Sequence, residues 1–362
     1  MEKQKRQSNF ELLRILAMLL IIGHHFSVHG GFTFSPTDLS LNSLWIQGLA
    51  LGGKLGVNLF VLISGYFLCS QTHFRVYKAC ALHTQVVFYS LAVFVLSFLL
   101  GQPFSIRGFV FTLLPITNET WWFASCYFVL FLFSPFINIL LQNLSKRQHQ
   151  ILLLLMGVLW CGIYTVLSRF VQNNNLLWFF ALYVFAAYIR KYADFSYSPR
   201  KLYVLCGIML LLVYLLHVGS GYLGTKISWF AGFAHRVYAM ESVPMLALSV
   251  LVFLAFKNTN ISYVPWVNRI SATTFGIYLL HDHPYIRPLL WTDFLKNAQF
   301  SHRGMLIPYS LLCILGVFLA CSAFEFCRSG FFRLWYDKAY CCLSNLIRNK
   351  ILPFLQSHSL CK

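Results

Sequence analysis

Charged residues are scarce in this chain, and acidic residues are the scarcest. Its 362 residues include only 10 aspartates and glutamates, and charged residues together make up 10% of the sequence. A soluble domain carries about 25% charged residues, so the composition excludes an ordinary soluble globular protein. Hydrophobic residues instead make up 58% of the chain, and the mean hydropathy is +0.66. We therefore expect an integral membrane protein.

The sequence also lacks metal-binding cysteine patterns, internal repeats and low-complexity segments. Its eleven cysteines show no ligand spacing, and the adjacent pair Cys341-Cys342 falls in an expected cytoplasmic segment where thiols stay reduced. The first apolar stretch has no small-residue cleavage site, which favours a membrane span over a cleaved signal peptide. No soluble segment is long enough for an enzyme domain, so any chemistry is expected inside the membrane bundle.

Apolar stretches of about 20 residues, long enough to cross a ~30 Å hydrocarbon core, recur along the chain. They lie roughly at residues 12–30, 49–69, 84–101, 122–141, 151–168, 176–189, 202–219, 239–256, 271–286 and 304–326. The pattern predicts an all-α, polytopic transmembrane bundle of about ten helices. Residues 1–330 are expected to form the transmembrane domain, and residues 331–362 a short basic cytoplasmic tail.

The net charge of +18 is distributed as expected for membrane orientation. If the N-terminus is cytoplasmic, 20 of the 28 lysines and arginines fall on the inner side, in agreement with the positive-inside rule. The other eight lie on outer loops or near outer helix ends: Lys54, Arg107, Arg169, Lys226, Arg236, Arg287, Lys296 and Arg303. This bias predicts an even number of spans with both termini in the cytoplasm, and no nucleic-acid partner.

The first stretch, ELLRILAMLLIIGHHF, carries an arginine and two histidines among apolar residues. Arg14 and His25 are eleven residues apart, which on a helix is ~20° past three full turns and ~16 Å along the axis. They are expected to share one face, whereas His24 points elsewhere and is interpreted as a packing residue. Ionisable groups at membrane depth usually mark pathways or sites, although Arg14 could also extend to lipid phosphates. A histidine near mid-membrane suits proton abstraction or relay.

Two further pairs have a functional and a structural interpretation. Ser64 and Gly65 could carry an acyl group, but small residues in membrane helices more often allow close packing. Arg75 and Lys78, three residues apart, share a helix face and could bind phosphates. They could equally be positive-inside anchors.

Candidates on the outer side include Glu119 and Trp122 at an expected helix start, where a sugar could bind. An acid also suits the helix dipole there, and tryptophan suits the membrane interface. Glu241 is the only acid in an otherwise lipid-like helix, so it could line a pathway.

The remaining candidate site residues lie in the segment around His281. Tyr278 and His281, one turn apart, are expected with Arg287 at the outer mouth of the bundle. His281 and His283 would point to different helix faces, so we expect no metal site there.

Four segments together resemble the acyltransferase-3 family of membrane O-acyltransferases. Arg14 and His25 match its Arg, ten residues, His pattern, and GVNLFVLISGYF from Gly56 resembles its second helix. WWFASCYFVLFLFSPFIN from Trp121 and TTFGIYLLHDHPYIRPLLW from Thr273 resemble its later signatures. The loop HFRVYKACALHTQVVFYS departs from many members, because it lacks their later arginine and proline.

The resemblance implies transfer of an acyl group, usually acetyl from cytoplasmic acetyl-CoA, to a hydroxyl of a lipid-linked or cell-surface polysaccharide. It implies Arg14 and His25 as catalytic residues, no bound cofactor, no metal, and a location in the bacterial inner (plasma) membrane. Arg75 and Lys78 would bind the donor. A proton-coupled transporter or flippase is the alternative; it predicts inverted repeats, which the sequence does not show. A purely structural protein is disfavoured by the ionisable residues within the spans.

The predicted orientation can be tested with reporter fusions. A reporter inserted in the loop at residues 190–201 should be active only as a cytoplasmic fusion, because that loop carries four of the inner basic residues. A reporter at residues 225–227 serves as the outer control. A loop at 190–201 found outside would contradict the proposed topology.

Overall fold

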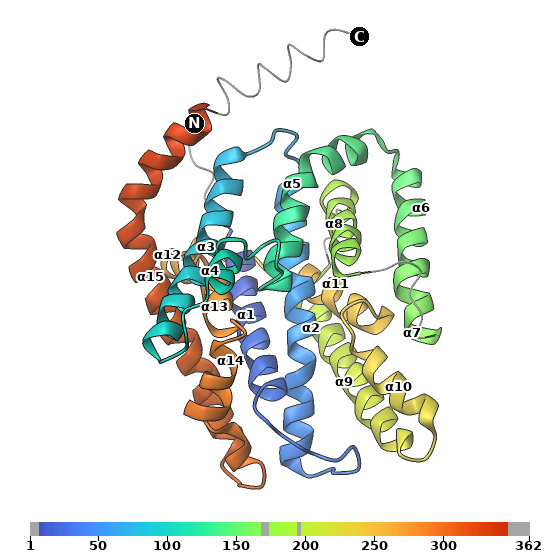
Figure 1. Ribbon diagram of the computed structural model, residues 1–362. Helices are drawn as coiled ribbons and strands as arrows, with labels where there is room; N and C mark the ends of the chain where they lie inside the picture. The colour runs from blue at the N-terminus through green and yellow to red at the C-terminus, as the bar shows by residue number, and fades with distance from the viewer. Residues whose placement is uncertain (1–6, 168–173, 194–196, 347–362) are drawn as a thin grey trace.

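The chain folds into a bundle of helices (Figure 1), and the described residues contain no strand. The computed structural model describes residues 7–167, 174–193 and 197–346, with side chains up to residue 332. Within these described residues, seven helical segments are long and apolar enough to cross a membrane. They are α1 (Ser8–Val28), α2 (Leu41–Leu68), α3 (Val76–Leu99), α5 (Trp122–Asn143), α6 to α7 (Lys146–Leu167), α9 (Pro199–Gly224) and the first part of α15 (Leu306–Leu346). The prediction of an all-α membrane bundle is confirmed.

The other three apolar stretches form shorter helices. They become α8 (Asn175–Tyr192), α11 (Val243–Asn258) and, in place of one span at 271–286, the short pair α12 (Pro265–Ser271) and α13 (Thr274–His281). The chain turns at Ala272 and Thr273, and Pro284 follows soon after α13. Proline lacks a backbone N–H and cannot continue a helix interior, so α13 ends before Pro284.

Short elements connect the long helices. These are α4 (Ile106–Leu113), the π-helical turn η1 (Gly157–Gly162) between α6 (Lys146–Met156) and α7 (Ile163–Leu167), α10 (Ser228–Val237), α14 (Ile286–Pro288), the π-helical η2 (Leu289–Phe294) and the 3-10 turn η3 (Asn297–Phe300). Helix α15 passes through the expected domain boundary at 330, and residues 347–362 of the expected tail lie outside the described residues.

Contacts between distant segments define the two ends of the bundle. At one end, the start of α1 meets α11 and α12, because Asn9 Nδ2 donates to the Phe256 carbonyl and Ser8 Oγ to Asn268. At the other end, Asn42 Nδ2 at the start of α2 donates to the Ser301 and Arg303 carbonyls. Helices α1 and α2 therefore begin at opposite ends of the bundle (Figure 1).

Helices α1 and α2 lie very close to each other. A Cβ atom on Gly56 would lie 2.6 Å from the Ala17 carbonyl oxygen, and one on Gly52 would lie 3.0 Å from the Leu20 carbonyl oxygen. A Cβ atom on Gly53 would overlap the His24 ring. Small residues allow such close contact of backbones in membrane helices. The spacing fixes α1 and its polar residues against α2.

The buried side-chain amide of Asn58, two residues after Gly56 in α2, joins three helices. Asn58 of α2 is fully buried; its Nδ2 donates to the Met240 carbonyl (2.7 Å) and to Ser249 Oγ (3.1 Å). Its Oδ1 accepts from Trp178 Nε1 at 3.0 Å. Every polar atom of the Asn58 side chain is therefore engaged, and α2 is linked to α8 and α11.

Replacement of Asn58 should destabilise the bundle. Asn58→Ala leaves the Trp178 N–H and the Met240 carbonyl without their partner, which costs about 1–3 kcal/mol for a buried group. Thermal unfolding in detergent, followed by fluorescence, should show a midpoint several degrees lower. Asn143→Ala is the matched control, because the Asn143 side chain is exposed and bonds only within its own helix. Equal midpoints for the two variants would contradict the assigned role.

Candidate active site

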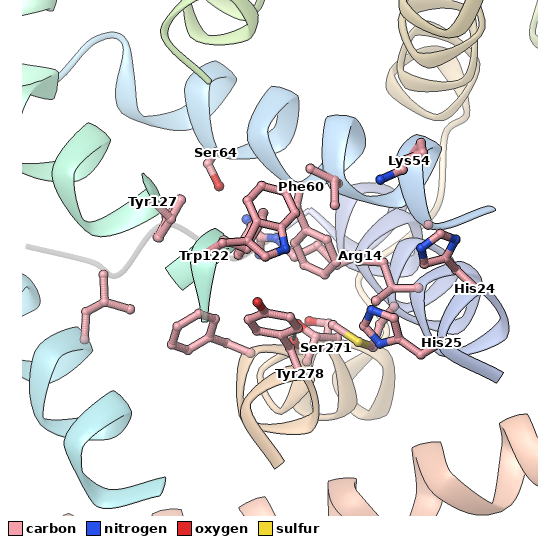
Figure 2. A pocket seen from close by; sticks show the side chains of 18 of the residues that line it. Arg14, His24, His25, Lys54, Phe60, Ser64, Trp122, Tyr127, Ser271 and Tyr278 are labelled. Atoms are coloured by element: carbon pink, nitrogen blue, oxygen red, sulfur yellow. Dashed lines mark hydrogen bonds between the residues drawn. The ribbon is translucent and has the colours of Figure 1, made fainter. Parts of the chain in front are cut away.

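A cavity of about 350 Å³ lies between α1, α2, α3, α5, α12 and α13 (Figure 2). It is lined by Arg14, Met18, Ile21, His24, His25, Gly53, Lys54, Val57, Phe60, Ser64, Leu82, Gln85, Trp122, Phe123, Tyr127, Ser271, Ala272, Thr274, Phe275 and Tyr278. Five side chains from the sequence-based set, Arg14, His25, Ser64, Trp122 and Tyr278, line it. Residues from the first and last thirds of the chain thus meet at one place.

Arg14 is held on the cavity wall by a carboxylate of its own helix. Its Nη1 donates to Glu11 Oε1 at 2.7 Å, and Glu11 also accepts from Ser271 Oγ. The Arg14 side chain is 24% exposed, whereas that of Glu11 is buried. A guanidinium has five N–H donors, so the pair with Glu11 leaves donors for an anionic ligand.

The hydrogen bonds around His25 determine which of its two ring nitrogens carries the hydrogen in the neutral ring. His281 Nδ1 lies 2.6 Å from the Ile277 carbonyl oxygen, which only accepts, so this nitrogen carries a hydrogen. In a neutral His281 ring, Nε2 is then the acceptor, and it lies 2.9 Å from His25 Nδ1. His25 therefore donates from Nδ1 and has its lone pair on Nε2 when both rings are neutral. His281 thus forms a hydrogen bond with His25 but does not itself line the cavity.

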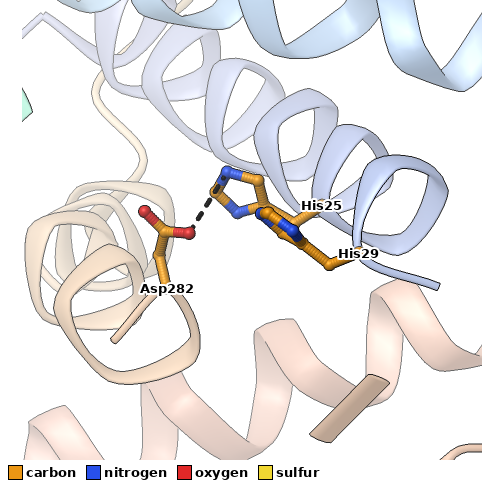
Figure 3. Close-up of side chains that lie close together, drawn as sticks. All are labelled: His25, His29 and Asp282. Carbon is orange, nitrogen blue, oxygen red and sulfur yellow. Dashed lines mark ion pairs between the residues drawn. The ribbon is translucent and has the colours of Figure 1, made fainter. Parts of the chain in front are cut away.

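A buried carboxylate lies beside His25 Nε2. Asp282 Oδ1 is 3.4 Å from this nitrogen, and Asp282 is only 1% exposed (Figure 3). The same oxygen accepts from Arg287 Nε at 2.7 Å. A neutral His25 and Asp282 would present two acceptors to each other, whereas a protonated His25 would form an ion pair. Asp282 therefore favours a positive charge on His25.

His25, His29 and Asp282 are also spaced as possible metal ligands. One ligand atom from each lies within 4.8 Å of the others (Figure 3). Arg287 adds a positive charge on the Asp282 oxygen that would bind the ion. The donor set fits a proton-bearing cluster better than a metal centre, and the absence of a metal stays a prediction.

His24 also lines the cavity, although its helical position had indicated a packing role. Its Nδ1 lies 2.6 Å from the Ala50 carbonyl oxygen, and its ring fills the space beside Gly53. The cavity follows the groove between α1 and α2, so a residue about 80° round α1 from Arg14 still reaches it. The hydrogen bond to Ala50 shows that His24 also joins the two helices.

Ser64 and Gly65 face different neighbours. Ser64 lines the cavity at the end that also holds Tyr127 (Figure 2). A Cβ atom on Gly65 would lie 2.8 Å from Ala186 Cβ and 3.2 Å from Tyr183 Cα, so Gly65 allows α2 and α8 to pack. The two interpretations left open by the sequence thus apply to different residues of the pair.

The other sequence-based candidates lie away from the cavity wall. Arg75 and Lys78 are exposed around the start of α3, and Arg75 donates to Gln71. Glu119 is exposed and has a left-handed φ of 49°. Glu241 is partly buried in the turn between α10 and α11. Arg287 forms an ion pair with Asp282.

Sequence reasoning missed three buried acids near the site, which are Glu11, Asp282 and Glu325. Glu325 of α15 accepts from Tyr89 (2.5 Å) and Gln85 (3.1 Å) and forms an ion pair with Arg328 (2.6 Å). Gln85 lines the cavity, so Glu325 orients one of its walls. Glu325 is the only acid in the tenth apolar stretch, so the reasoning applied to Glu241 would have found it.

Residues 7–335 match the model of the acyltransferase-3 family, described as an acyltransferase domain. The match covers nearly the whole chain, including every helix that lines the cavity. No curated protein and no solved structure matches the chain. The resemblance seen in the four motifs is confirmed: the chain belongs to the acyltransferase-3 family.

Proposed function

We propose that this membrane acyltransferase moves acetyl from cytoplasmic acetyl-CoA to a hydroxyl of a lipid-linked or cell-surface polysaccharide sugar. The observation that carries the proposal is His25, with its Nδ1 hydrogen bonded to His281, on the wall of a cavity that also contains Arg14. We further propose that the protein resides in a bacterial inner (plasma) membrane with both termini in the cytoplasm, as the basic residues indicate.

The proposed donor path follows α3. Arg75 and Lys78 could bind the CoA phosphates at the cytoplasmic side, where arginine offers a bidentate match. Leu82 and Gln85, one and two turns farther along α3, line the cavity. The thioester arm would therefore extend along α3 towards Arg14.

The aromatic wall of the cavity is the proposed acceptor surface. Trp122, Phe123, Tyr127 and Tyr278 line it, and ligand sites commonly combine aromatic side chains with a few polar groups that fix orientation. Glu119, Glu241 and Arg287 do not line the cavity, and they stay predictions as acceptor-side residues.

In the proposed reaction, the sugar hydroxyl oxygen attacks the thioester carbonyl carbon. His25 Nε2 takes the hydroxyl proton as the C–O bond forms, and the C–S bond breaks to release CoA as a thiolate. The proton then passes from His25 to the thiolate, so CoA leaves as the thiol. Asp282, 3.4 Å away, stabilises the positive charge that His25 carries between the two transfers. A general base contributes roughly 10²–10⁴-fold to the rate.

His25→Ala should abolish ester formation, whereas His24→Ala should reduce it much less. Removal of His25 eliminates the base, a loss of about 10²–10⁴-fold in rate. Removal of His24 eliminates only a hydrogen bond between α1 and the Ala50 carbonyl of α2. Mass spectrometry of cell-surface glycans from cells with the wild type, each variant or no gene would measure the ester, with membrane levels checked by blotting. Full activity of His25→Ala, or equal loss in both variants, would refute the general-base assignment.

The double variant Arg75→Ala with Lys78→Ala should raise the KM for acetyl-CoA more than it lowers kcat. A phosphate clamp contributes similar binding energy to the ground state and the transition state, so its loss appears mainly in KM. Steady-state kinetics in reconstituted vesicles would measure both constants. Lys146→Ala with Arg147→Ala, an exposed basic pair at the start of α6, is the control. An unchanged KM would assign Arg75 and Lys78 to membrane orientation alone.

A further inference from the structure

Lys54 places a positive charge on the cavity wall in the middle of a membrane-spanning helix. It lies 13 residues after Leu41 and 14 before Leu68, the ends of α2, which is about 20 Å from either end. A lysine side chain is too short to carry its ammonium over that distance to the interface. Lys54 lines the cavity together with His24 and His25 (Figure 2).

The ammonium of Lys54 has no partner among the described residues. No hydrogen bond or ion pair within 4.0 Å involves it in residues 7–167, 174–193 and 197–332. Glu241 is the acidic group whose field acts on Lys54, yet the two do not form an ion pair. A cation inside a membrane bundle is costly unless it is paired, and such residues commonly mark substrate paths.

The surroundings favour an anion as the missing partner. Phe60, Phe123 and Phe275 supply apolar walls, and a low local dielectric strengthens attraction between opposite charges. Gly53, next to Lys54, packs against the His24 ring, so Lys54 lies at the level of the two histidines. An anionic group bound by Lys54 would therefore be close to the group that His25 acts upon.

We infer that Lys54 forms an anion subsite, so the substrate carries a carboxylate or phosphate near the acylated position. The inference rests on the proposed function and adds the charge class of the substrate. The anion belongs either to an acidic acceptor sugar or to a dicarboxylic acyl group such as succinyl; both present the same chemistry to Lys54.

Two ligand pairs, in each of which one member carries a carboxylate that the other lacks, test the subsite and its source. Full-length protein in lipid nanodiscs is titrated with phenyl glucuronide and phenyl glucoside, and separately with succinyl-CoA and acetyl-CoA. The wild type should bind the more acidic member of one pair about tenfold more tightly, a value between exposed and buried ion pairs. Preference for glucuronide assigns the anion to the acceptor, and preference for succinyl-CoA assigns it to the acyl group.

Variants at position 54 decide whether Lys54 is responsible. Lys54→Gln should reduce the preference to about one while the ligand without the additional carboxylate binds as before, and Lys54→Arg should retain the preference. Lys226→Gln, an exposed lysine on the loop between α9 and α10, should change nothing. Equal affinities within both pairs for the wild type, including no detectable binding, would overturn the inference, as would a preference that survives in Lys54→Gln.

Turnover separates this inference from the proposed function. Acyl transfer without a charge preference would support the acyltransferase function and overturn the subsite. A preference that depends on Lys54 without any acyl transfer would support the subsite and count against the proposed reaction.

Discussion

Polar groups inside this bundle must find their partners within the protein, because the lipid core offers none. Asn58 meets the condition with three hydrogen bonds, and Glu325 does so with Tyr89, Gln85 and Arg328. Such groups bind the helices to one another where there is little hydrophobic force between helices in lipid. Polar groups that face the cavity can instead bind a substrate, so the same constraint separates structural from functional residues.

The close contact of α1 and α2 gives the cavity its shape. Gly52, Gly53 and Gly56 bring the two backbones together, and the polar residues of both helices therefore face a common groove. Arg14, with Glu11 and Ser271, lies on one part of this groove, and His25 with His281 and Asp282 lies on another. His25 is thus held directly by His281 of α13, whereas Arg14 is held by Glu11 of its own helix, which in turn accepts from Ser271 of α12. Both arrangements restrict the side chains before a substrate binds.

Part of the site followed from the sequence because it depends on one continuous helix. Arg14 and His25 lie in the uninterrupted helix α1, so an eleven-residue spacing was enough to bring both to one cavity. Lys54 was counted as an outer residue because the second apolar stretch begins at 49, whereas α2 begins at Leu41. The polar residues Asn42, Ser43 and Gln47 interrupt the apolar pattern, so the first turns of that helix were not predicted as part of the span.

Contacts between distant segments could not be read from spacing. The sequence indicated His281 at the outer mouth, but its bond to His25 depends on how α13 packs against α1. Helical periodicity also excluded His24 from the face of Arg14, because it describes one helix and not the groove between two. The division of residues 265–281 into two short helices falls at Ala272 and Thr273, where the sequence has no proline or glycine to signal it.

The bond between His25 and His281 has a consequence for biogenesis, because 256 residues separate the two in the chain. Membrane helices enter the bilayer in order of synthesis, so α1 is inserted long before its partner exists. Helix α13 has eight residues, far fewer than the ~20 needed to cross a bilayer, and it must be held by neighbours such as α15. A nascent chain therefore carries His25 without its hydrogen-bond partner His281 until the last helices are inserted, and under the proposed function a chain that ends before α13 is expected to be inactive.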